Sequence, residues 1–424
     1  MPLLRAVFPA LVLTCLVLLA GLLYVFGYRA QYHALLQAWG AFPFRFPFLD
    51  MHAVTASVEC HRRGFDVYVD NPCDVFHRPH GYSPLWLWLA VLPITTGWDC
   101  ALGLAAVVLF LLAVASLPPG RDWWQVGVIT LGTISSAVAF ALERANVDLL
   151  MFVMAASAIA LARRRCRWRM LGYAVALLAG MLKFYPATLL ILAVRERLAA
   201  FVAIGIAALG VIAVWFALDA RNILRGMANI PTASAFSDND FGVRNLPFGL
   251  AQYLGLPPWA GAALLVALLC AMFAVAVALA RQVDLRALTE AETTCLLVGS
   301  VLIVTCFLAA QNVQYRAIHL LFALPGLTAL ARQVDVRCRV TVALIVILMW
   351  SGAINAPLDA GLTRLGVPAL PDGETHVAVW LARELMWWCV VTMLAALMLR
   401  LLWDSRARRD AAPLWSSSRF HAQR

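Results

Sequence analysis

Polar and ionisable residues gather at positions 50–84, between long apolar runs of the chain. Because the chain is 63% hydrophobic and only 13% charged, this concentration of carboxylates, imidazoles and guanidinium groups is where chemistry is expected. Asp50 ends an approach rich in Phe and Pro, FPFRFPFLD. A carboxylate held in this way at a membrane surface can act as a general base on a hydroxyl group. The alternative is that Asp50 caps a helix beginning near Met51.

Two further candidates, Asp66 and Tyr68, follow Gly64 in the sequence GFDVY. A tight turn at this glycine would present the carboxylate and the phenol together, as the recognition of sugar hydroxyls requires. A solvated loop explains the same residues equally well, so both interpretations stay open.

The histidines of the same stretch follow no recognised metal-ligand spacing, and we expect no metal and no cofactor. They are His52, His61, His77 and His80. Cys60 and Cys73 also lie in this polar stretch, unlike the other eight cysteines. In an oxidising compartment the two would form a disulfide, and elsewhere they would be free thiols.

A second polar group, ERANVD at 143–148, separates two apolar runs. Glu143, Asn146 and Asp148 occupy this junction of helices, where polar side chains either satisfy backbone groups or line a cavity. Arg144 would serve an anionic ligand there. The competing interpretation is that Arg144 pairs with Glu143 or Asp148, as charges near a membrane usually do.

Cations recur in two later segments. Lys183 opens the sequence KFYP, which contains Tyr185, and a phosphate or a carboxylate would stabilise this cation. Arg316 and His319 are one helical turn apart and share one face. Together with Lys183 they suit a lipid-linked phosphate better than a soluble substrate, and a buried pair with Glu143 is the alternative.

The composition predicts an all-α polytopic membrane protein. Apolar runs of about 17–25 residues recur along the 424-residue chain, and each is long enough to cross a bilayer as a helix. The net charge of +10 comes mostly from short basic clusters between these runs, which indicates topology and not nucleic-acid binding. The first run, 6–26, is expected to be an uncleaved helix.

We predict one membrane-embedded domain over 1–403, a first outer loop at 28–84 and a disordered, basic cytoplasmic tail at 404–424. The bundle would contain about 12 apolar passes. The cluster RRRCRWR at 163–169 marks the inner side, which places the loop at 28–84 on the outer face.

Two runs break this alternation of crossings. Arginines at both ends of 170–194 favour a broken hairpin whose outer turn is Lys183 to Pro186. The run 85–96, with Pro84 before it and Pro93 inside it, is expected not to cross fully. Irregular backbone of this kind is tolerated at membrane depth where it lines a water-filled cavity.

As an ordered set, short motifs along the chain resemble glycosyltransferase family 87, the polyprenol-phosphate-mannose-dependent mannosyltransferases of the GT-C class. The matching pieces are an early acidic residue (Asp50), a G-x-D-x-Y step (Gly64, Asp66, Tyr68), an aromatic-Ser-Pro step (Tyr82, Ser83, Pro84), the polar step 143–148, the Lys-aromatic-x-Pro step 183–186, and a late His followed by Pro (His319, Pro325). The chain departs from the family in having Glu143-Arg144-Ala145-Asn146 where Gly-Gln-x-Asn is usual, which leaves the sugar open.

The resemblance implies a GT-C-type bundle that transfers a hexose, mannose in the family, from a polyprenyl-phosphate donor to a lipid or glycan acceptor. The transfer would be metal-independent and inverting, on the extracytoplasmic side of a bacterial inner membrane. Asp50 would be the general base. The donor phosphate would be bound by Arg144, Lys183, Arg316 and His319. Contacts to the sugar or acceptor would come from Asp66, Tyr68, Tyr82, Glu143, Asn146 and Tyr185.

Two other functions share these features. A secondary transporter also has broken helices and intramembrane charges, but the chain has no internal repeat, and its longest polar segment lies outside the membrane midplane. A flippase for lipid-linked sugars would use the same cavity without chemistry.

Overall fold

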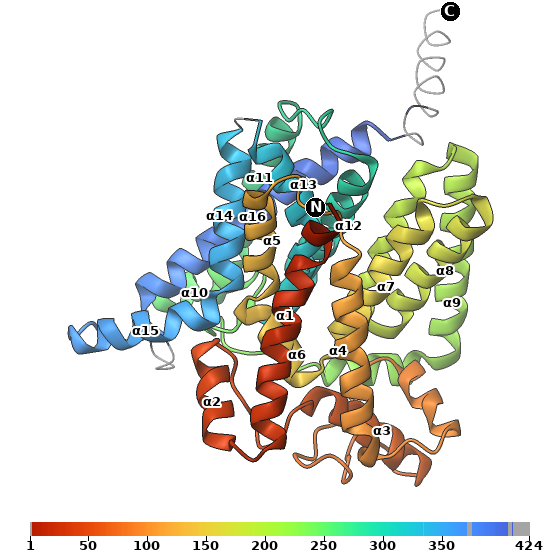
Figure 1. The fold of residues 1–424 in the computed structure, drawn as a ribbon, viewed down its shortest axis with the longest axis vertical. Coiled ribbons are helices and arrows are strands. Elements are labelled where there is room, and N and C mark those ends of the chain that lie inside the picture. Colours follow the sequence, from red (N-terminus) through yellow and green to blue (C-terminus); the bar gives the residue numbers. More distant parts are fainter. Residues whose placement is uncertain (1, 334, 371–374, 406–408, 410–424) are drawn as a thin grey trace, which may run out of the picture.

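The computed structural model describes residues 2–333, 335–370, 375–405 and 409. Helices form nearly all of the regular structure in this part of the chain (Figure 1). The α-helices of the first half are α1 (Pro2–Val25), α2 (Arg29–Ala38), α3 (Leu49–Arg62), α4 (Asp99–Ala115), α5 (Trp123–Thr133), α6 (Ser136–Arg144), α7 (Val147–Ala162) and α8 (Cys166–Lys183). Those of the second half are α9 (Leu198–Ala228), α10 (Asn245–Tyr253), α11 (Pro258–Ala280), α12 (Glu290–Ala309), α13 (Leu320–Ala331), α14 (Val336–Met349), α15 (Ser351–Arg364) and α16 (Val377–Trp403).

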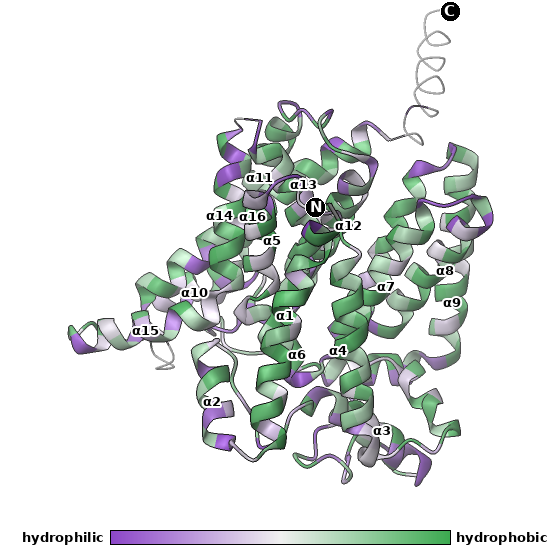
Figure 2. Cartoon of the chain, viewed as in Figure 1, coloured by the Kyte–Doolittle hydropathy of each residue, from purple (hydrophilic) through white to green (hydrophobic). Residues whose placement is uncertain are grey.

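Several helices are long and apolar enough to cross a membrane, as the sequence predicts. Within the described residues there are six of them, or up to eight if each of two bent helix pairs is one span. The bent pairs are α5 with α6, at 44°, and α14 with α15, at 74°. Figure 2 shows apolar residues along the upright helices and polar residues toward their two ends. The protein is therefore an all-α integral membrane protein.

A layer of short helices that contains the polar stretch 50–84, called the polar layer, closes one end of the bundle, the lower end in Figure 1. It contains α2, α3 and two 3₁₀ helices, η1 (Pro84–Val91) and η2 (Thr96–Trp98). Because a 3₁₀ helix rises about 2 Å per residue, the eight residues of η1 extend roughly 16 Å and cannot cross a bilayer. This length agrees with the expectation that 85–96 does not cross fully, which stays a prediction.

The predicted broken hairpin is also present. Helix α8 ends at Lys183, the chain reverses at Phe184 with a φ of 63°, and the 3₁₀ helix η3 (Tyr185–Arg195) returns along α8. At the far end of this hairpin, Nε of Arg169 lies 2.6 Å from Oε1 of Glu196. A Cβ atom on Gly180 would lie 2.6 Å from Ala187, so the close approach of the two helices requires glycine there.

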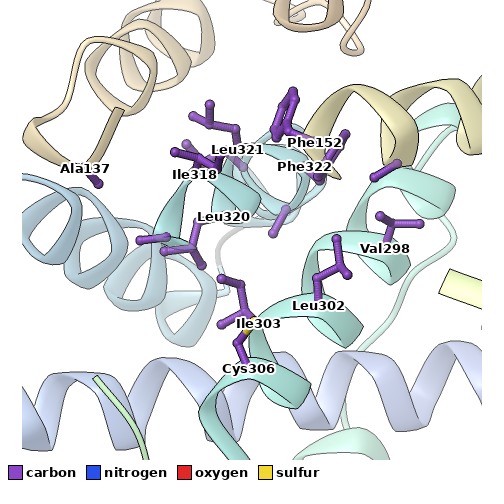
Figure 3. Packing of buried hydrophobic residues seen from close by; sticks show 14 of the residues in the cluster. Ala137, Phe152, Val298, Leu302, Ile303, Cys306, Ile318, Leu320, Leu321 and Phe322 are labelled. Carbon is purple, nitrogen blue, oxygen red and sulfur yellow. The ribbon is translucent and has the colours of Figure 1, made fainter. Parts of the chain in front are cut away.

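The core lies between α7, α12 and α13 (Figure 3). All residues of α13 are buried, and its Phe322 stacks on Phe152 of α7 with ring centroids 4.2 Å apart. Apolar packing on every side makes α13 a rigid support for the short 3₁₀ helix η4 (Gln314–His319) that precedes it.

Two short strands connect distant loops next to η4. Strand β1 (Asp240–Phe241) pairs antiparallel with β2 (Asn312–Val313), with Asp240 opposite Val313. The pairing fixes the segment that leads into η4. Of the predicted tail, 404–424, only Asp404, Ser405 and Arg409 lie within the described residues.

Candidate active site

Asp50 lies in the first turn of α3, and the turn that precedes it has Phe48 in the left-handed conformation, with a φ of 69°. Its side chain is buried but accepts two strong hydrogen bonds at Oδ2. Nε of Arg144 donates at 2.9 Å and Nδ2 of Asn146 donates at 2.6 Å. Within the described part of the chain, Oδ1 of Asp50 accepts no hydrogen bond from another side chain, and Nη1 of Arg78 lies 3.8 Å from it. One oxygen of this carboxylate is thus held and the other is available.

Asn146 connects Asp50 to a second charged group. The left-handed residue Ala145, with a φ of 43°, turns the chain between α6 and α7, and Asn146 caps α7 by accepting a hydrogen bond from the backbone N–H of Asp148. The same Oδ1 also accepts from Nζ of Lys183 at 3.2 Å. A single amide therefore orients both Asp50 and Lys183.

The second charged group is centred on Asp148, which is fully buried. Its Oδ2 lies 2.8 Å from Nζ of Lys183 and 3.6 Å from Nε of Arg316, while its Oδ1 accepts from the hydroxyl of Tyr185 at 2.7 Å. One carboxylate between two cations leaves an excess positive charge. Such an arrangement favours an anionic ligand beside Lys183 and Arg316.

His319 is fully buried behind this group. Because the single hydroxyl proton of Tyr185 is directed to Asp148, the contact of 2.6 Å between the Tyr185 hydroxyl and Nε2 of His319 requires His319 to donate. The imidazole stacks on Phe152 and Phe322. Its hydrogen bond toward the charged group goes to the hydroxyl of Tyr185.

A cavity of about 440 Å³ brings the two charged groups together. Its charged lining consists of Asp50, Arg78, Arg144, Lys183 and Arg316, and its aromatic lining includes Tyr82 and Tyr315. Two carboxylates lie behind this lining: Asp74 pairs with Arg78, and Asp148 pairs with Lys183 and Arg316. Four cations therefore meet three carboxylates, and the cavity has an excess of positive charge.

The structure thus brings together five of the predicted site residues as cavity lining, namely Asp50, Tyr82, Arg144, Lys183 and Arg316. Three others, Asn146, Tyr185 and His319, stand directly behind these. Glu143 does not line the cavity, and its Oε1 accepts from the backbone N–H of Phe44 at 3.4 Å. Arg144 pairs with Asp50, which is neither of the partners that the sequence favoured.

Asp66 and Tyr68 do not line this cavity. Oδ2 of Asp66 lies 2.6 Å from Nη2 of Arg225 on α9, and that hydrogen bond holds the pKa of Asp66 below its usual range. Tyr68 is buried against the ring of His80, 5.4 Å away. Its backbone oxygen accepts a hydrogen bond from Asn229, which does line the cavity. The predicted turn therefore supports a lining residue without lining the cavity itself.

Two lining residues of the cavity, Arg78 and Tyr315, were not among the predicted site residues. Arg78 lies among the histidines of the polar stretch and has no distinguishing motif, and Tyr315 directly precedes Arg316. Asp148 was considered as a residue of the helix junction and as a partner of Arg144, but not as the partner of Lys183 and Arg316. The proximity of Asp148 to Lys183, which is predicted to lie at a hairpin turn, is the one signal that could have identified its role.

Several other polar residues of the 50–84 stretch have structural contacts. His52 pairs through Nδ1 with Asp99 at 2.7 Å, and Cys60 forms a disulfide with Cys73. Burial lowers the pKa of His80 to about 4, so this imidazole is neutral. Among the described residues, no group of three or more His, Cys, Asp or Glu side chains has the arrangement of a metal site.

The fold and the site define an integral membrane protein with a cationic cavity and one available carboxylate. A protein-family comparison matches residues 76–305, more than half of the 424, to glycosyltransferase family 87. The chain belongs to this family, as its motifs predicted, and is a membrane glycosyltransferase. The matched region includes Arg78, Arg144, Asn146 and Lys183. Comparisons with curated proteins and with solved structures find no match.

Proposed function

We propose that the protein transfers a hexose, in the first instance mannose, from a polyprenyl-phosphate donor to a hydroxyl group of a lipid or glycan acceptor. The observation that carries the proposal is the placement of one available carboxylate oxygen, on Asp50, in the same cavity as four cations. A base and an anion-binding group are the two parts that such a transfer needs.

Asp50 is the proposed general base. Its Oδ1 removes the proton of the acceptor hydroxyl, the acceptor oxygen forms a bond to the anomeric carbon, and the bond from that carbon to the phosphate oxygen breaks. Arg144 and Asn146 donate hydrogen bonds to Oδ2, which fixes the orientation of the carboxylate. Because attack and departure occur on opposite sides of one carbon, the transfer inverts the anomeric configuration.

Lys183 and Arg316 are the proposed ligands of the donor phosphate. The phosphodiester of the donor carries one negative charge and the departing polyprenyl phosphate carries two, so one charge develops during the reaction. Fixed cations stabilise such a developing charge most strongly where water is excluded. The leaving phosphate needs no proton, and we propose that the reaction is metal-independent.

We further propose that the bundle is of the GT-C type, with about 12 apolar passes, the shorter helices α7, α8 and α13 completing those that are long enough to cross alone. The polar layer of α3 and η1 then forms the first outer loop. The disulfide between Cys60 and Cys73 supports a location on the extracytoplasmic side of a bacterial inner membrane.

The test is transfer of radiolabelled mannose from synthetic polyprenyl-phosphate-mannose by purified protein in proteoliposomes, with lipid extracted from the source membranes as the acceptor pool. Asp50→Asn and Asp50→Ala should each lower the rate by about 10²–10⁴-fold. Asp70→Asn is the matched control, because Asp70 is an exposed carboxylate of the same loop.

Full transfer by both Asp50 variants would reject Asp50 as the base. Absence of transfer by the wild type with polyprenyl-phosphate-mannose and with the corresponding glucose and galactose donors would reject the proposed donor class. A flippase or a secondary transporter would then be the better hypothesis, to be tested by movement of the intact lipid across the vesicle membrane.

A further inference from the structure

Arg78 is a cation of the cavity whose guanidinium group is pinned along one edge. Its Nε lies 3.2 Å from Oδ1 and 3.1 Å from Oδ2 of Asp74, and its Nη2 donates to Oδ2 of Asp74 at 2.7 Å. Nη2 also donates to the backbone oxygen of Leu49 at 3.1 Å. These contacts leave Nη1 as the donor that faces the cavity.

The support behind Arg78 is itself rigid. The side chain of Asp74 is buried and accepts from the backbone N–H of Phe76 at 2.8 Å. The preceding residue, Cys73, is joined by the disulfide to Cys60 of α3, the helix whose first turn contains Asp50. Arg78 and Asp50 are therefore fixed relative to each other by a covalent link and by α3.

Nη1 of Arg78 and Oδ1 of Asp50 are 3.8 Å apart. This separation is too long for a direct hydrogen bond, but one oxygen atom can lie about 2.8 Å from both. An oxygen in that position must accept from Nη1 and donate to Oδ1. A hydroxyl group has this combination of one donor and available lone pairs, whereas a phosphate oxygen cannot donate to the carboxylate.

We propose that the gap between Arg78 and Asp50 is the subsite of the acceptor hydroxyl, and that Arg78 positions the attacking oxygen. The inference rests on the proposed function, because it takes Asp50 as the base. As the proton passes to Oδ1 and the bond to the anomeric carbon forms, the acceptor oxygen gains negative character that the Nη1–H group stabilises. Arg78 thus belongs to the acceptor side of the cavity, and Lys183 and Arg316 to the donor side.

The charges around the two sides agree with this division. Arg78 and Arg144 are balanced by Asp74 and Asp50, so the acceptor side has no excess charge and suits a neutral hydroxyl. The excess positive charge is beside Asp148, where Lys183 and Arg316 share one carboxylate.

The experiment separates acceptor saturation from donor saturation in the proteoliposome assay. The concentration of source-membrane lipid extract is varied at fixed polyprenyl-phosphate-mannose, and then the reverse. Arg78→Gln should raise the extract concentration for half-maximal rate by about 10-fold and leave the donor KM within twofold, because one hydrogen bond to the acceptor is lost. Arg78→Lys should recover part of the loss, and Asp74→Asn should give a smaller rise than Arg78→Gln.

Arg63→Gln is the matched control, because Arg63 lies in the same polar stretch, 50–84, but pairs with Glu59 outside the cavity. This variant should change neither the half-saturating extract concentration nor the donor KM. Binding of undecaprenyl phosphate, measured by thermal shift, should be unchanged in Arg78→Gln. The unfolding temperature from the same measurement shows whether that variant is folded. A higher donor KM or weaker undecaprenyl phosphate binding in Arg78→Gln, with unchanged acceptor saturation, would overturn this inference. Full transfer by Asp50→Asn would instead overturn the proposed function.

Discussion

Nδ2 of Asn146 donates a hydrogen bond of 2.6 Å to Oδ2 of Asp50, across 96 residues of sequence. The other end of the same amide accepts from Nζ of Lys183. The proposed base and the proposed phosphate ligand are therefore oriented by one side chain at the start of α7. Since an amide offers a donor at one end and an acceptor at the other, it serves the two groups at once.

Asn146→Ser should lower the transfer rate by about 10–100-fold with little effect on folding. Serine keeps an oxygen that can cap α7, but it is too short to reach both Asp50 and Lys183. Loss of a hydrogen bond to each charged group is expected to remove about 1.5–3 kcal/mol of orientation energy. The rate is measured in proteoliposomes and folding by the thermal unfolding temperature.

Asn222→Ser serves as its control, because Asn222 pairs with Asp219 on α9 and should leave the rate unchanged. A rate for Asn146→Ser equal to that of the wild type would show that Asp50 and Lys183 are oriented without the amide.

Lys183→Met should destabilise the protein as well as abolish donor binding. Asp148 is fully buried, and without Lys183 its nearest cation is Nε of Arg316 at 3.6 Å. Breaking a buried ion pair from one side typically costs about 3–5 kcal/mol. The double variant Lys183→Met/Asp148→Asn should recover much of this loss, because the uncompensated carboxylate is gone.

Thermal unfolding in detergent measures the recovery, and thermal shift with undecaprenyl phosphate measures binding. The double variant should unfold closer to the wild type than the single variant does, yet still fail to bind the lipid phosphate. Restored binding in the double variant would mean that Lys183 only neutralises Asp148 and is not a ligand.

The sequence predicted the chain segments that form this site better than it predicted which charged residues pair within it. Inside-type arginines at both ends of 170–194 required a reversal of the chain, and the reversal occurs at Phe184. Pro84 and Pro93 indicated an irregular segment at 85–96, and the structure has the eight-residue 3₁₀ helix η1 there. Both features follow from local composition, which a single sequence contains.

Long-range pairing could not be obtained in the same way. The partner of Arg144 was sought within the adjacent residues, but it is Asp50, 94 residues away. Asp66 was expected to line the cavity because its turn carries hydroxyl-binding residue types, yet it pairs with Arg225, 159 residues further along. Which charges meet depends on how α3, α6 and α9 pack, and residue type alone does not determine that packing.

The stability of the protein should fall as the pH is lowered from about 6.5 toward 4. His80 is buried against the rings of Tyr68 and Tyr82, and its Nε2 lies 3.3 Å from the backbone oxygen of Ser83. Burial lowers its pKa to about 4 in the folded protein, from 6.5. Between these values the unfolded chain binds a proton that the folded protein does not, so folding loses about 3 kcal/mol, and the loss ends below pH 4.

The measurement compares the thermal unfolding temperature at pH 7.5 and pH 4.5 in wild type and His80→Phe. Other groups titrate in this range, so the expected result is a smaller decrease in the variant than in the wild type. His61→Phe is the control, because His61 is exposed and should leave the pH dependence unchanged. An equal decrease in His80→Phe and wild type would show that His80 is protonated in the folded state.

In cells, Cys60 and Cys73 should resist maleimide labelling until a reductant is added. The structure joins them across 13 residues, the first of the two alternatives that the sequence left open. In a variant that keeps these two of the ten cysteines, a maleimide–polyethylene glycol mass shift after denaturation should appear only with reductant. A variant that keeps Cys15 and Cys100, both free and exposed, should be labelled under either condition.

The disulfide should also stabilise the loop by about 3 kcal/mol, because it restricts the unfolded chain. Cys60→Ala/Cys73→Ala should therefore be cut faster by protease between residues 61 and 78 and should saturate with acceptor at higher concentration, as Arg78→Gln does. Labelling without reductant in cells would place this loop in a reducing compartment, and the cavity beside Asp50 would then open toward the cytoplasm.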